Sequence, residues 1–294
     1  MILLFFKESD GMKTILIYFG LIVLCLHVNG QTRIELEKNF PKTEQQVNYL
    51  PGNDSLWVFI MAGQSNMAGR GYVESSDTLF NRRIITINRD NEWIYAKEPL
   101  HFYQPELTGL DCGLSFATEL LRYIPKHITI ALIPTAVGGS SIDKWTDDNL
   151  YKGMYLKSNF MQKVDLAKSI GQIKAILWHQ GESDATDEKI PRYESRLKEL
   201  FCFFREYINI EDLPVIVAEL GQYSDQQKYG GKWNQINAII HKVAKEQPFT
   251  FLVATGDLYS NSDKIHFNGP SQRELGRRFC FAFINGIENI KKQK

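Results

Sequence analysis

The segment IMAGQSNMAGRG, residues 60–71, joins an apolar run to a turn made of small and polar residues. The run begins at Leu56 and is long enough for a β-strand, and it stops at a glycine, a glutamine, Ser65 and an asparagine. A buried strand that ends on one serine between two amides allows two interpretations. The serine either belongs to a turn or is a nucleophile presented at the end of a sheet, and the other strand ends distinguish the two.

Six short apolar runs alternate with amphipathic segments after residue 55. The runs are rich in isoleucine and valine and almost continuously apolar, which is typical of strands buried on both faces. Strands that alternate with helices predict an α/β fold in which helices cover both faces of a parallel sheet. The predicted strands span residues 56–62, 83–88, 128–134, 175–180, 214–220 and 250–254, and the predicted helices span residues 113–123, 189–208, 233–244 and 272–284.

Polar clusters follow four of these predicted strands. The first strand leads to Ser65, the third to the pair Gly138-Gly139, the fourth to HQGESD at residues 179–184, and the last to DKIH at residues 263–266. Because active sites in parallel sheets gather beyond the carboxyl ends of the strands, we expect the four clusters to meet at one edge of the sheet. This convergence favours a catalytic role for the serine over a simple turn.

A serine hydroxyl becomes a nucleophile when a base lies within hydrogen-bond reach and a carboxylate orients that base. Asp263 and His266 stand three residues apart, so a tight turn would bring the carboxylate to the imidazole. The sequence therefore predicts Ser65 as nucleophile, His266 as base and Asp263 as its partner. Glu182 is the alternative acid for the histidine, and a surface aspartate beside a solvated histidine is the alternative for the pair.

The oxyanion of an acyl-transfer intermediate needs hydrogen-bond donors. The candidates are the N–H of Ser65, a glycine N–H from Gly138 or Gly139, and the side-chain amide of Gln180. The alternatives are that the glycine pair forms an ordinary turn and that Gln180 caps local backbone. We interpret His179 as a structural or pocket-lining residue rather than as the base.

The composition argues against several other classes of protein. Lys+Arg and Asp+Glu number 34 each, so the chain has no net charge to attract nucleic acid or an anionic membrane. CxxC, HExxH and phosphate-loop patterns are absent from the sequence, and we expect neither a metal nor a cofactor. Cys202 and Cys280 lie in helix-like apolar runs and are predicted to be core thiols.

The N-terminal residues resemble an export signal. Residues 12–30 hold one lysine, an apolar run from Ile15 to Leu26 and small residues before Gln31. We expect residues 1–30 to be a signal peptide, with Met12 as an alternative start, residues 31–54 to be a lead-in segment and residues 55–294 to form a single domain. The predicted location is periplasmic or extracellular without a stable membrane partner, and an uncleaved anchor is the alternative.

Four motifs together are specific enough to indicate a family. The blocks GQSNM, VGGSSI, WHQGESD and DKIH follow one another in that order. They resemble the SGNH hydrolase superfamily and, more narrowly, its sialate O-acetylesterases and the acetylxylan esterases of carbohydrate esterase family 6. The resemblance covers about residues 56–285 and implies a flavodoxin-like, three-layer α/β/α fold without a metal.

The resemblance also implies roles for single residues. Ser65 corresponds to the nucleophile, His266 to the base and Asp263 to its partner, while Ser65, Gly139 and Gln180 would form the oxyanion hole. Gln180 stands where many members of the superfamily have asparagine, and Gly138 remains an alternative to Gly139. Gln64 and Asn66 are expected to brace the serine turn, in the same supporting class as Glu182 and His179.

The implied activity is removal of O-acetyl groups from an acetylated saccharide such as a glycan, xylan or sialic acid. The alternatives are a non-catalytic carbohydrate-binding protein on the same fold and a lipase or thioesterase of the superfamily. Aromatic residues such as Trp145 and Trp233 are candidates for stacking on sugars. Arg70 would bind a carboxylate of sialic acid or pair with an acid of a loop. The loops expected to select the substrate span residues 72–81, 101–111, 140–160 and 223–232.

Overall fold

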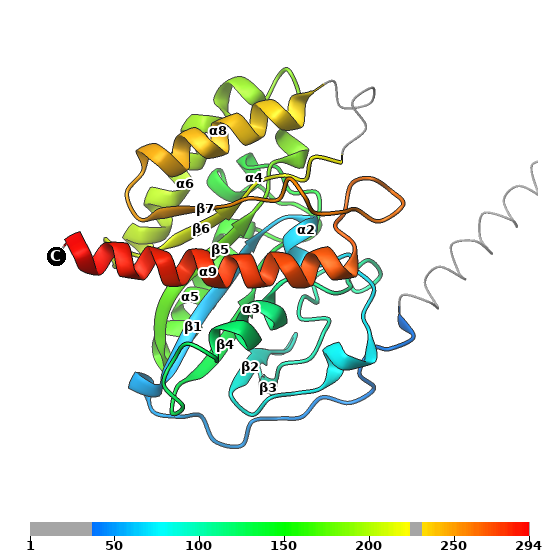
Figure 1. Ribbon diagram of the computed structural model, residues 1–294, viewed down its shortest axis with the longest axis vertical. Coiled ribbons are helices and arrows are strands. Elements are labelled where there is room, and N and C mark those ends of the chain that lie inside the picture. The colour runs from blue at the N-terminus through cyan, green and yellow to red at the C-terminus, as the bar shows by residue number, and fades with distance from the viewer. Residues whose placement is uncertain (1–36, 224–230, 294) are drawn as a thin grey trace, which may run out of the picture. The chain divides into compact units, whose positions relative to one another are not determined.

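The computed structural model describes residues 37–223 and 231–293 (Figure 1). The predicted signal peptide and the alternative start at Met12 lie outside the described residues, as does most of the loop expected at residues 223–232. From Phe40 onward, the described residues belong to one compact unit.

A mostly parallel sheet forms the middle layer of the unit. In the described residues it has seven strands, and all neighbours run parallel except β2 and β3, which pair antiparallel at one edge. Across the sheet, the strands are β3 (Trp93–Tyr95), β2 (Ile84–Ile87), β4 (Thr129–Pro134), β1 (Leu56–Gly63), β5 (Gln172–His179), β6 (Val215–Ala218) and β7 (Thr250–Val253). The predicted α/β fold is confirmed, and the serine turn follows the central strand.

Helices cover both faces of this sheet (Figure 1). Buried residues of α3 and α9 pack on one face, and those of α4, α5, α6 and α8 pack on the other. The helices are α2 (Ser65–Ala68), α3 (Gly113–Leu120), α4 (Asp143–Thr146), α5 (Leu156–Ile170), α6 (Ile190–Ile208), α8 (Lys232–Glu246) and α9 (Gly269–Gln293). Short 3-10 helices are η1 (Asn53–Ser55), η2 (Ser75–Thr78) and η3 (Glu182–Asp184). The predicted three-layer arrangement is therefore present.

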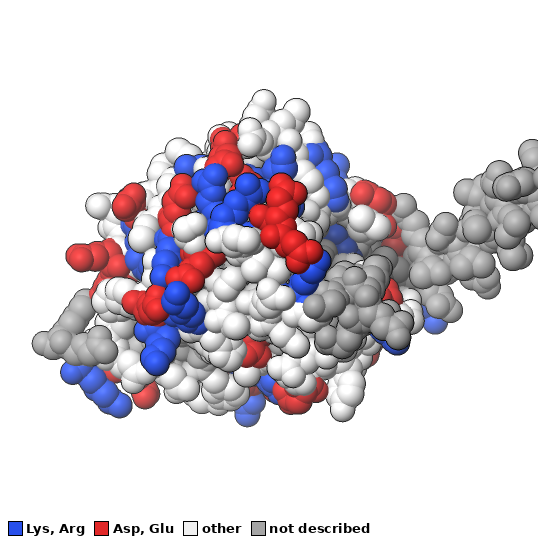
Figure 2. Space-filling model, turned by 90° about the horizontal axis from the view of Figure 1, so that it is seen from above, with Lys and Arg blue, Asp and Glu red and all other residues white. Residues whose placement is uncertain are grey.

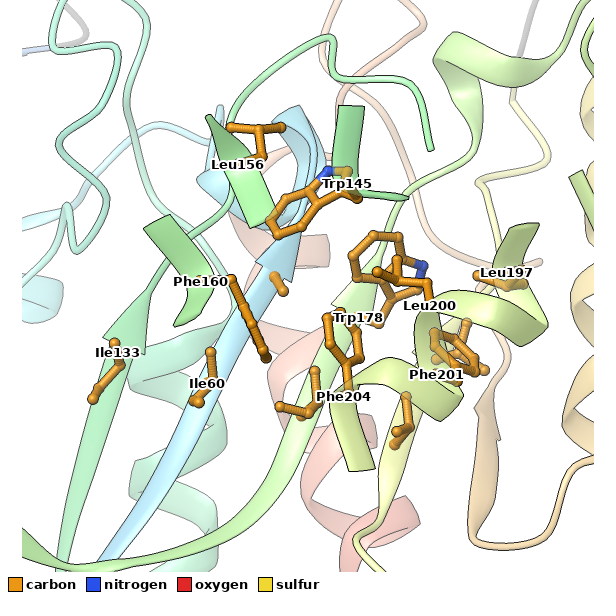
Figure 3. Packing of buried hydrophobic residues seen from close by; sticks show 14 of the residues in the cluster. Ile60, Ile133, Trp145, Leu156, Phe160, Trp178, Leu197, Leu200, Phe201 and Phe204 are labelled. Carbon is orange, nitrogen blue, oxygen red and sulfur yellow. The ribbon is translucent and has the colours of Figure 1, made fainter. Parts of the chain in front are cut away.

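Large aromatic side chains fill the space between the sheet and α4, α5 and α6 (Figure 3). Trp178 of β5 meets Trp145 of α4 edge to face, with ring centroids 5.3 Å apart and an interplanar angle of 80°. Phe160 and Phe204 join α5 to α6 with centroids 4.5 Å apart. Trp145 and Trp233 are almost fully buried, so the expectation that they stack on sugars is wrong. A buried ring removes roughly 150–250 Å² from water, which makes these residues packing elements.

The lead-in segment covers one edge of the sheet. The Val47 N–H donates to the Trp93 carbonyl at 2.8 Å, and the Tyr95 N–H donates to the Gln45 carbonyl at 2.8 Å. These bonds continue the antiparallel pairing beyond β3. Because an open strand edge invites pairing with other chains, this contact protects the edge.

Some local predictions fail. Cys202 is exposed on α6, because the buried face of that helix runs through Leu197, Phe201 and Phe204 instead, whereas Cys280 is buried as predicted. The segment expected as a loop at residues 140–160 contains α4 and the start of α5. Within residues 37–223 and 231–293, no helix is long and apolar enough to cross a membrane.

Basic and acidic side chains lie next to one another on the face drawn in Figure 2. Ion pairs of this kind join α6 to α8: Lys198 of α6 lies 2.7 Å from Glu246 of α8, and Lys242 of α8 lies 2.9 Å from Glu194 of α6. Exposed pairs contribute little stability, typically about 0–1 kcal/mol. On this face, the mixture agrees with a chain that has no net charge.

Candidate active site

The main chain turns sharply where β1 meets α2. Gly63 has a φ of +139°, and a Cβ at this position would collide with the carbonyl oxygen of His179 on the neighbouring strand β5. The next N–H, that of Gln64, donates to the same carbonyl at 3.0 Å. Only glycine fits such a close approach with this backbone angle. Ser65 is thereby held at the carboxyl end of the central strand, as the first residue of α2.

Ser65, His266 and Asp263 form one hydrogen-bonded chain. The Ser65 Oγ lies 3.0 Å from Nε2 of His266, and Nδ1 of His266 lies 2.7 Å from Oδ2 of Asp263. A proton on Nδ1 would be held by the carboxylate, which leaves Nε2 to accept the serine proton. Chemically, the arrangement can turn the hydroxyl into a nucleophile.

Asp263 is fixed by the turn in which it lies. Its Oδ1 accepts the N–H groups of Ile265 at 2.8 Å and His266 at 3.0 Å. Partial burial alone would raise the pKa of Asp263, but these bonds and the His266 side chain lower its pKa to about 2. The carboxylate is therefore ionised at neutral pH, and Glu182, the alternative acid, is not bonded to the His266 ring.

Two backbone N–H groups, one in the serine turn and one in the glycine pair, are not engaged. In the described part of the chain, neither the Ser65 N–H nor the Gly139 N–H has a hydrogen-bond acceptor. The Gly138 N–H instead donates to Oε1 of Gln104 at 2.7 Å. Gly139 has a φ of +75°, a conformation that favours glycine. Of the two glycines left open by the sequence, Gly139 has the free donor.

Gln180 has its side-chain amide bound inside the protein. Its Nε2 donates to the Ser140 carbonyl at 3.1 Å and to Oδ2 of Asp184 at 2.5 Å, while its Oε1 accepts from Tyr193. The residue is fully buried. Both amide hydrogens are therefore occupied in this structure, and the amide is not available to a substrate oxygen without a rearrangement.

The other residues singled out in the sequence lie close to the serine turn. His179 is fully buried, its Nε2 lies 3.0 Å from the Glu219 carbonyl, and its ring stacks on Phe267. Burial lowers the pKa of His179, so this imidazole is neutral. Gln64 accepts from the Ser183 N–H at 3.2 Å. Its amide thus links the serine turn to the segment that follows β5.

Two cations lie against the glycine pair, where sequence reasoning had flagged only Arg70. Arg70 donates to Gln104 at 3.1 Å, and Lys152 donates to the Gly138 carbonyl at 2.9 Å. Burial lowers the pKa of Arg70 to about 10, so it remains charged at neutral pH. Neither cation forms an ion pair with a carboxylate among residues 37–223 and 231–293. Gln104 and Lys152 belong to irregular segments without a motif, so their positions were not predictable.

Exposed tyrosines follow the serine turn and precede α5. Tyr72 and Tyr155 have 44% and 52% of their surface exposed, and both lie in segments expected to contact substrate. Across the two described ranges, no group of three or more His, Cys, Asp or Glu side chains could hold a metal ion.

Comparisons with known proteins agree in fold and in class. Residues 55–285 match the family model described as "Carbohydrate esterase, sialic acid-specific acetylesterase". The chain is 28% identical over 252 residues to the probable carbohydrate esterase At4g34215 of Arabidopsis thaliana, covering 78% of this chain and 91% of that protein. The solved structure of the Arabidopsis protein gives a TM-score of 0.69 at 26% identity, with 80% of this chain and 99% of that chain covered.

Two more distant structures share the fold. NanS gives a TM-score of 0.64 at 15% identity, and the match covers 82% of this chain and 100% of that chain. XAC1771, described as a carbohydrate acetylesterase from Xanthomonas citri, gives 0.58 at 20% identity and covers 78% of this chain and 55% of that one. At these identities the likeness concerns the fold alone.

Proposed function

Because the chain belongs to the sialic acid-specific acetylesterase family of carbohydrate esterases, we propose that it removes O-acetyl groups from saccharides through an acetyl-enzyme on Ser65. The observation that carries this proposal is the continuous hydrogen-bonded chain from Ser65 through His266 to Asp263. Such a chain supplies a nucleophile, a base and an orienting carboxylate.

In the first half of the reaction, the Ser65 Oγ attacks the acetyl carbonyl carbon while Nε2 of His266 takes the serine proton. The negative charge that develops on the carbonyl oxygen is stabilised by the N–H groups of Ser65 and Gly139. One such donor typically lowers the activation barrier by about 3–4 kcal/mol. The bond from the acetyl carbon to the sugar oxygen then breaks, and His266 returns its proton to that oxygen.

In the second half, a water molecule takes the place of the sugar. His266 removes one proton from the water as the water oxygen attacks the acetyl carbon. The same two N–H groups stabilise the second intermediate. The bond to Ser65 breaks, its Oγ regains the proton, and acetate leaves. Gln180 would add a third donor only after releasing Ser140 or Asp184.

We propose further that the saccharide is acidic. Arg70 and Lys152 lie against Gly138, directly before the N–H proposed for the oxyanion. Neither forms a direct ion pair among the described residues, and the carboxylate of Glu106 acts on both charges at longer range. A sugar that carries a carboxylate would form the direct ion pair that neither cation has with Glu106. The family description, which refers to sialic acid, is consistent with this chemistry.

The decisive experiment measures acetate released by the wild-type protein and by Ser65→Ala from O-acetylated sialic acid, acetylated xylo-oligosaccharides and a neutral aryl acetate. We expect the variant to lose activity on every substrate, by about 10³-fold or more. Saccharide binding without acetate release, unaffected by Ser65→Ala, would instead favour a binding protein. We also propose export of the protein, based on residues 12–30, which fractionation of expressing cells would test.

A further inference from the structure

Asn66, the residue next to the proposed nucleophile, binds the main chain on both sides of His266. Its Oδ1 accepts the Phe267 N–H at 3.0 Å, and its Nδ2 donates to the Ile265 carbonyl at 3.2 Å. The side chain is fully buried. One amide therefore holds the two peptide groups that flank the imidazole, across 201 positions of sequence.

We propose that Asn66 is a positioning residue that sets His266 relative to Ser65, and that Glu182 reinforces the orientation of its amide. The inference rests on the proposed function, because it requires Ser65 and His266 to be the reacting pair. It adds a role that the hydrogen-bonded chain of Ser65, His266 and Asp263 does not contain.

The segment around His266 needs such an anchor. Asp263 has 42% of its side chain exposed, and Lys264 adopts a positive φ of 55°, so the turn itself lies at the surface. The Tyr223 hydroxyl also reaches the Ile265 carbonyl at 3.2 Å, but it comes from another segment of the chain. Asn66 is different because it shares α2 with Ser65, so its bonds couple base and nucleophile directly.

Behind α2, a second contact ties the same two regions together. Nε2 of Gln272, in the first turns of α9, donates to the Asn66 carbonyl at 2.9 Å. The start of α9, which follows His266, is therefore bound to the main chain of α2. Ile265 and Phe267, on either side of His266, are bound to the Asn66 side chain. Catalysis is sensitive to such placement, because a shift of about 1 Å can lower the rate by roughly 10²-fold.

Glu182 reinforces the direction in which the Asn66 amide points. Its Oε1 lies 2.6 Å from Nδ2 of Asn66. The Glu182 carboxyl oxygen and the Ile265 carbonyl both accept from the NH₂ group, and the amide oxygen is left to face the Phe267 N–H. The reversed amide would set two oxygens against each other.

The first test compares Asn66→Ala with a matched control. Asn237→Ala removes another buried amide, which binds the N–H and the carbonyl of Leu220 at 2.7 and 2.9 Å without touching Ser65 or His266. Hydrolysis of an aryl acetate gives kcat and KM, the rate of phosphorylation by diisopropyl fluorophosphate reports the reactivity of Ser65, and circular dichroism gives the folded fraction.

We expect Asn66→Ala to lower kcat and the phosphorylation rate together, by about 10²-fold per folded molecule, with KM changed less than about threefold. Asn237→Ala is expected to keep both rates within about threefold of the wild-type values, even if its melting temperature falls as far as that of Asn66→Ala. Asn66→Ala with both rates near the wild-type values would overturn the proposal, because a residue that only stabilises the fold has that signature.

A second pair of variants tests the role of Glu182 and remains informative if Asn66→Ala does not fold. Asn66→Asp places a carboxylate against Glu182, and the double variant Asn66→Asp/Glu182→Gln restores a donor opposite an acceptor. We expect the double variant to recover at least about tenfold of the kcat lost in Asn66→Asp. No recovery would contradict the orientation assigned to Glu182.

Ser65→Ala and His266→Ala separate this inference from the function on which it rests. If both are inactive while Asn66→Ala retains its rates, the inference fails and the proposed function stands. If Ser65→Ala still releases acetate, the proposed function fails, and the inference fails with it.

Discussion

Asp263 binds His266 twice, since one carboxylate oxygen lies 2.7 Å from Nδ1 of the ring and the other accepts the backbone N–H of the same residue at 3.0 Å. The acid thereby fixes both the ring and the main chain from which the ring projects. Three residues of spacing suffice for this double contact because the chain turns between them, with Lys264 at a positive φ.

Asp263→Asn is expected to lower kcat by roughly 10²–10⁴-fold. The amide oxygen can still accept the N–H groups of Ile265 and His266, but the side chain neither holds the Nδ1 proton as a carboxylate does nor stabilises the imidazolium. Acetate release from an aryl acetate measures the effect. Asp257→Asn, which breaks an ion pair with Arg278 instead, should keep the wild-type rate, and equal losses in both variants would contradict the assignment.

Lys152→Met is expected to discriminate between substrates. It removes a cation that lies beside the Gly138 carbonyl, so KM for O-acetylated sialic acid should rise about tenfold while KM for a neutral aryl acetate stays within about twofold. Lys168→Met, at a lysine bonded to the Tyr207 carbonyl, is the control. A uniform rise of KM for both substrates would indicate a change in the glycine turn rather than recognition of a carboxylate.

Gly63→Ala should destabilise the fold by about 2 kcal/mol or more. The new Cβ would collide with the His179 carbonyl at a φ of +139°. Gly52→Ala is a matched control, because a Cβ there has nothing within 4 Å. Denaturant unfolding compares the two, and a Gly63→Ala variant as stable as Gly52→Ala would rule out the steric account of this turn.

Asp184 makes stability depend on pH. Burial raises the pKa of its carboxyl from 3.8 to about 6 in the folded protein. Between about pH 4 and pH 6 the folded state therefore binds more protons than the unfolded state, and stability falls as the pH rises through this window, by ~3 kcal/mol in total. Asp184→Asn has no proton to lose there and can still accept the Ile142 N–H.

The measurement is the free energy of unfolding at pH 4 and pH 7 for the wild-type protein and for Asp184→Asn. From pH 4 to pH 7, we expect the free energy of unfolding of Asp184→Asn to increase by ~3 kcal/mol relative to that of the wild-type protein. Asp90→Asn, at an exposed position, should follow the wild-type curve. Parallel curves for wild type and Asp184→Asn would show that the buried carboxyl is not the source.

The strands of the parallel sheet could be predicted because each contains a short, mostly apolar run that is largely buried. β3 could not, since three half-buried residues carry no period, and its place depends on pairing with β2 and with residues 45–47. Helix periodicity located α6 but gave Cys202 the wrong face. Apolar content likewise cannot distinguish a tryptophan of the core, such as Trp145, from one at a rim.

For the site, the rule that clusters meet at strand ends explains why Ser65 and His266 could be paired from sequence. The rule could not reveal the hydrogen-bond partners of the Gln180 side chain and of the Gly138 N–H. Gln180 is bound by Ser140 and Asp184, and Gln104 takes the Gly138 N–H, because those partners come from segments without a motif. Long-range hydrogen bonds between irregular segments depend on the completed fold, and local spacing does not encode them.

The separation of Ser65 from His266, 201 positions along the chain, has a consequence for synthesis. A ribosome releases the serine early and the histidine late, because His266 follows β7 in the chain. Under the proposed function, ester hydrolysis would therefore begin only when this contact between distant parts of the chain has formed. In a refolding experiment, recovered activity would time the closing of that contact, later than any signal from helices or single strands.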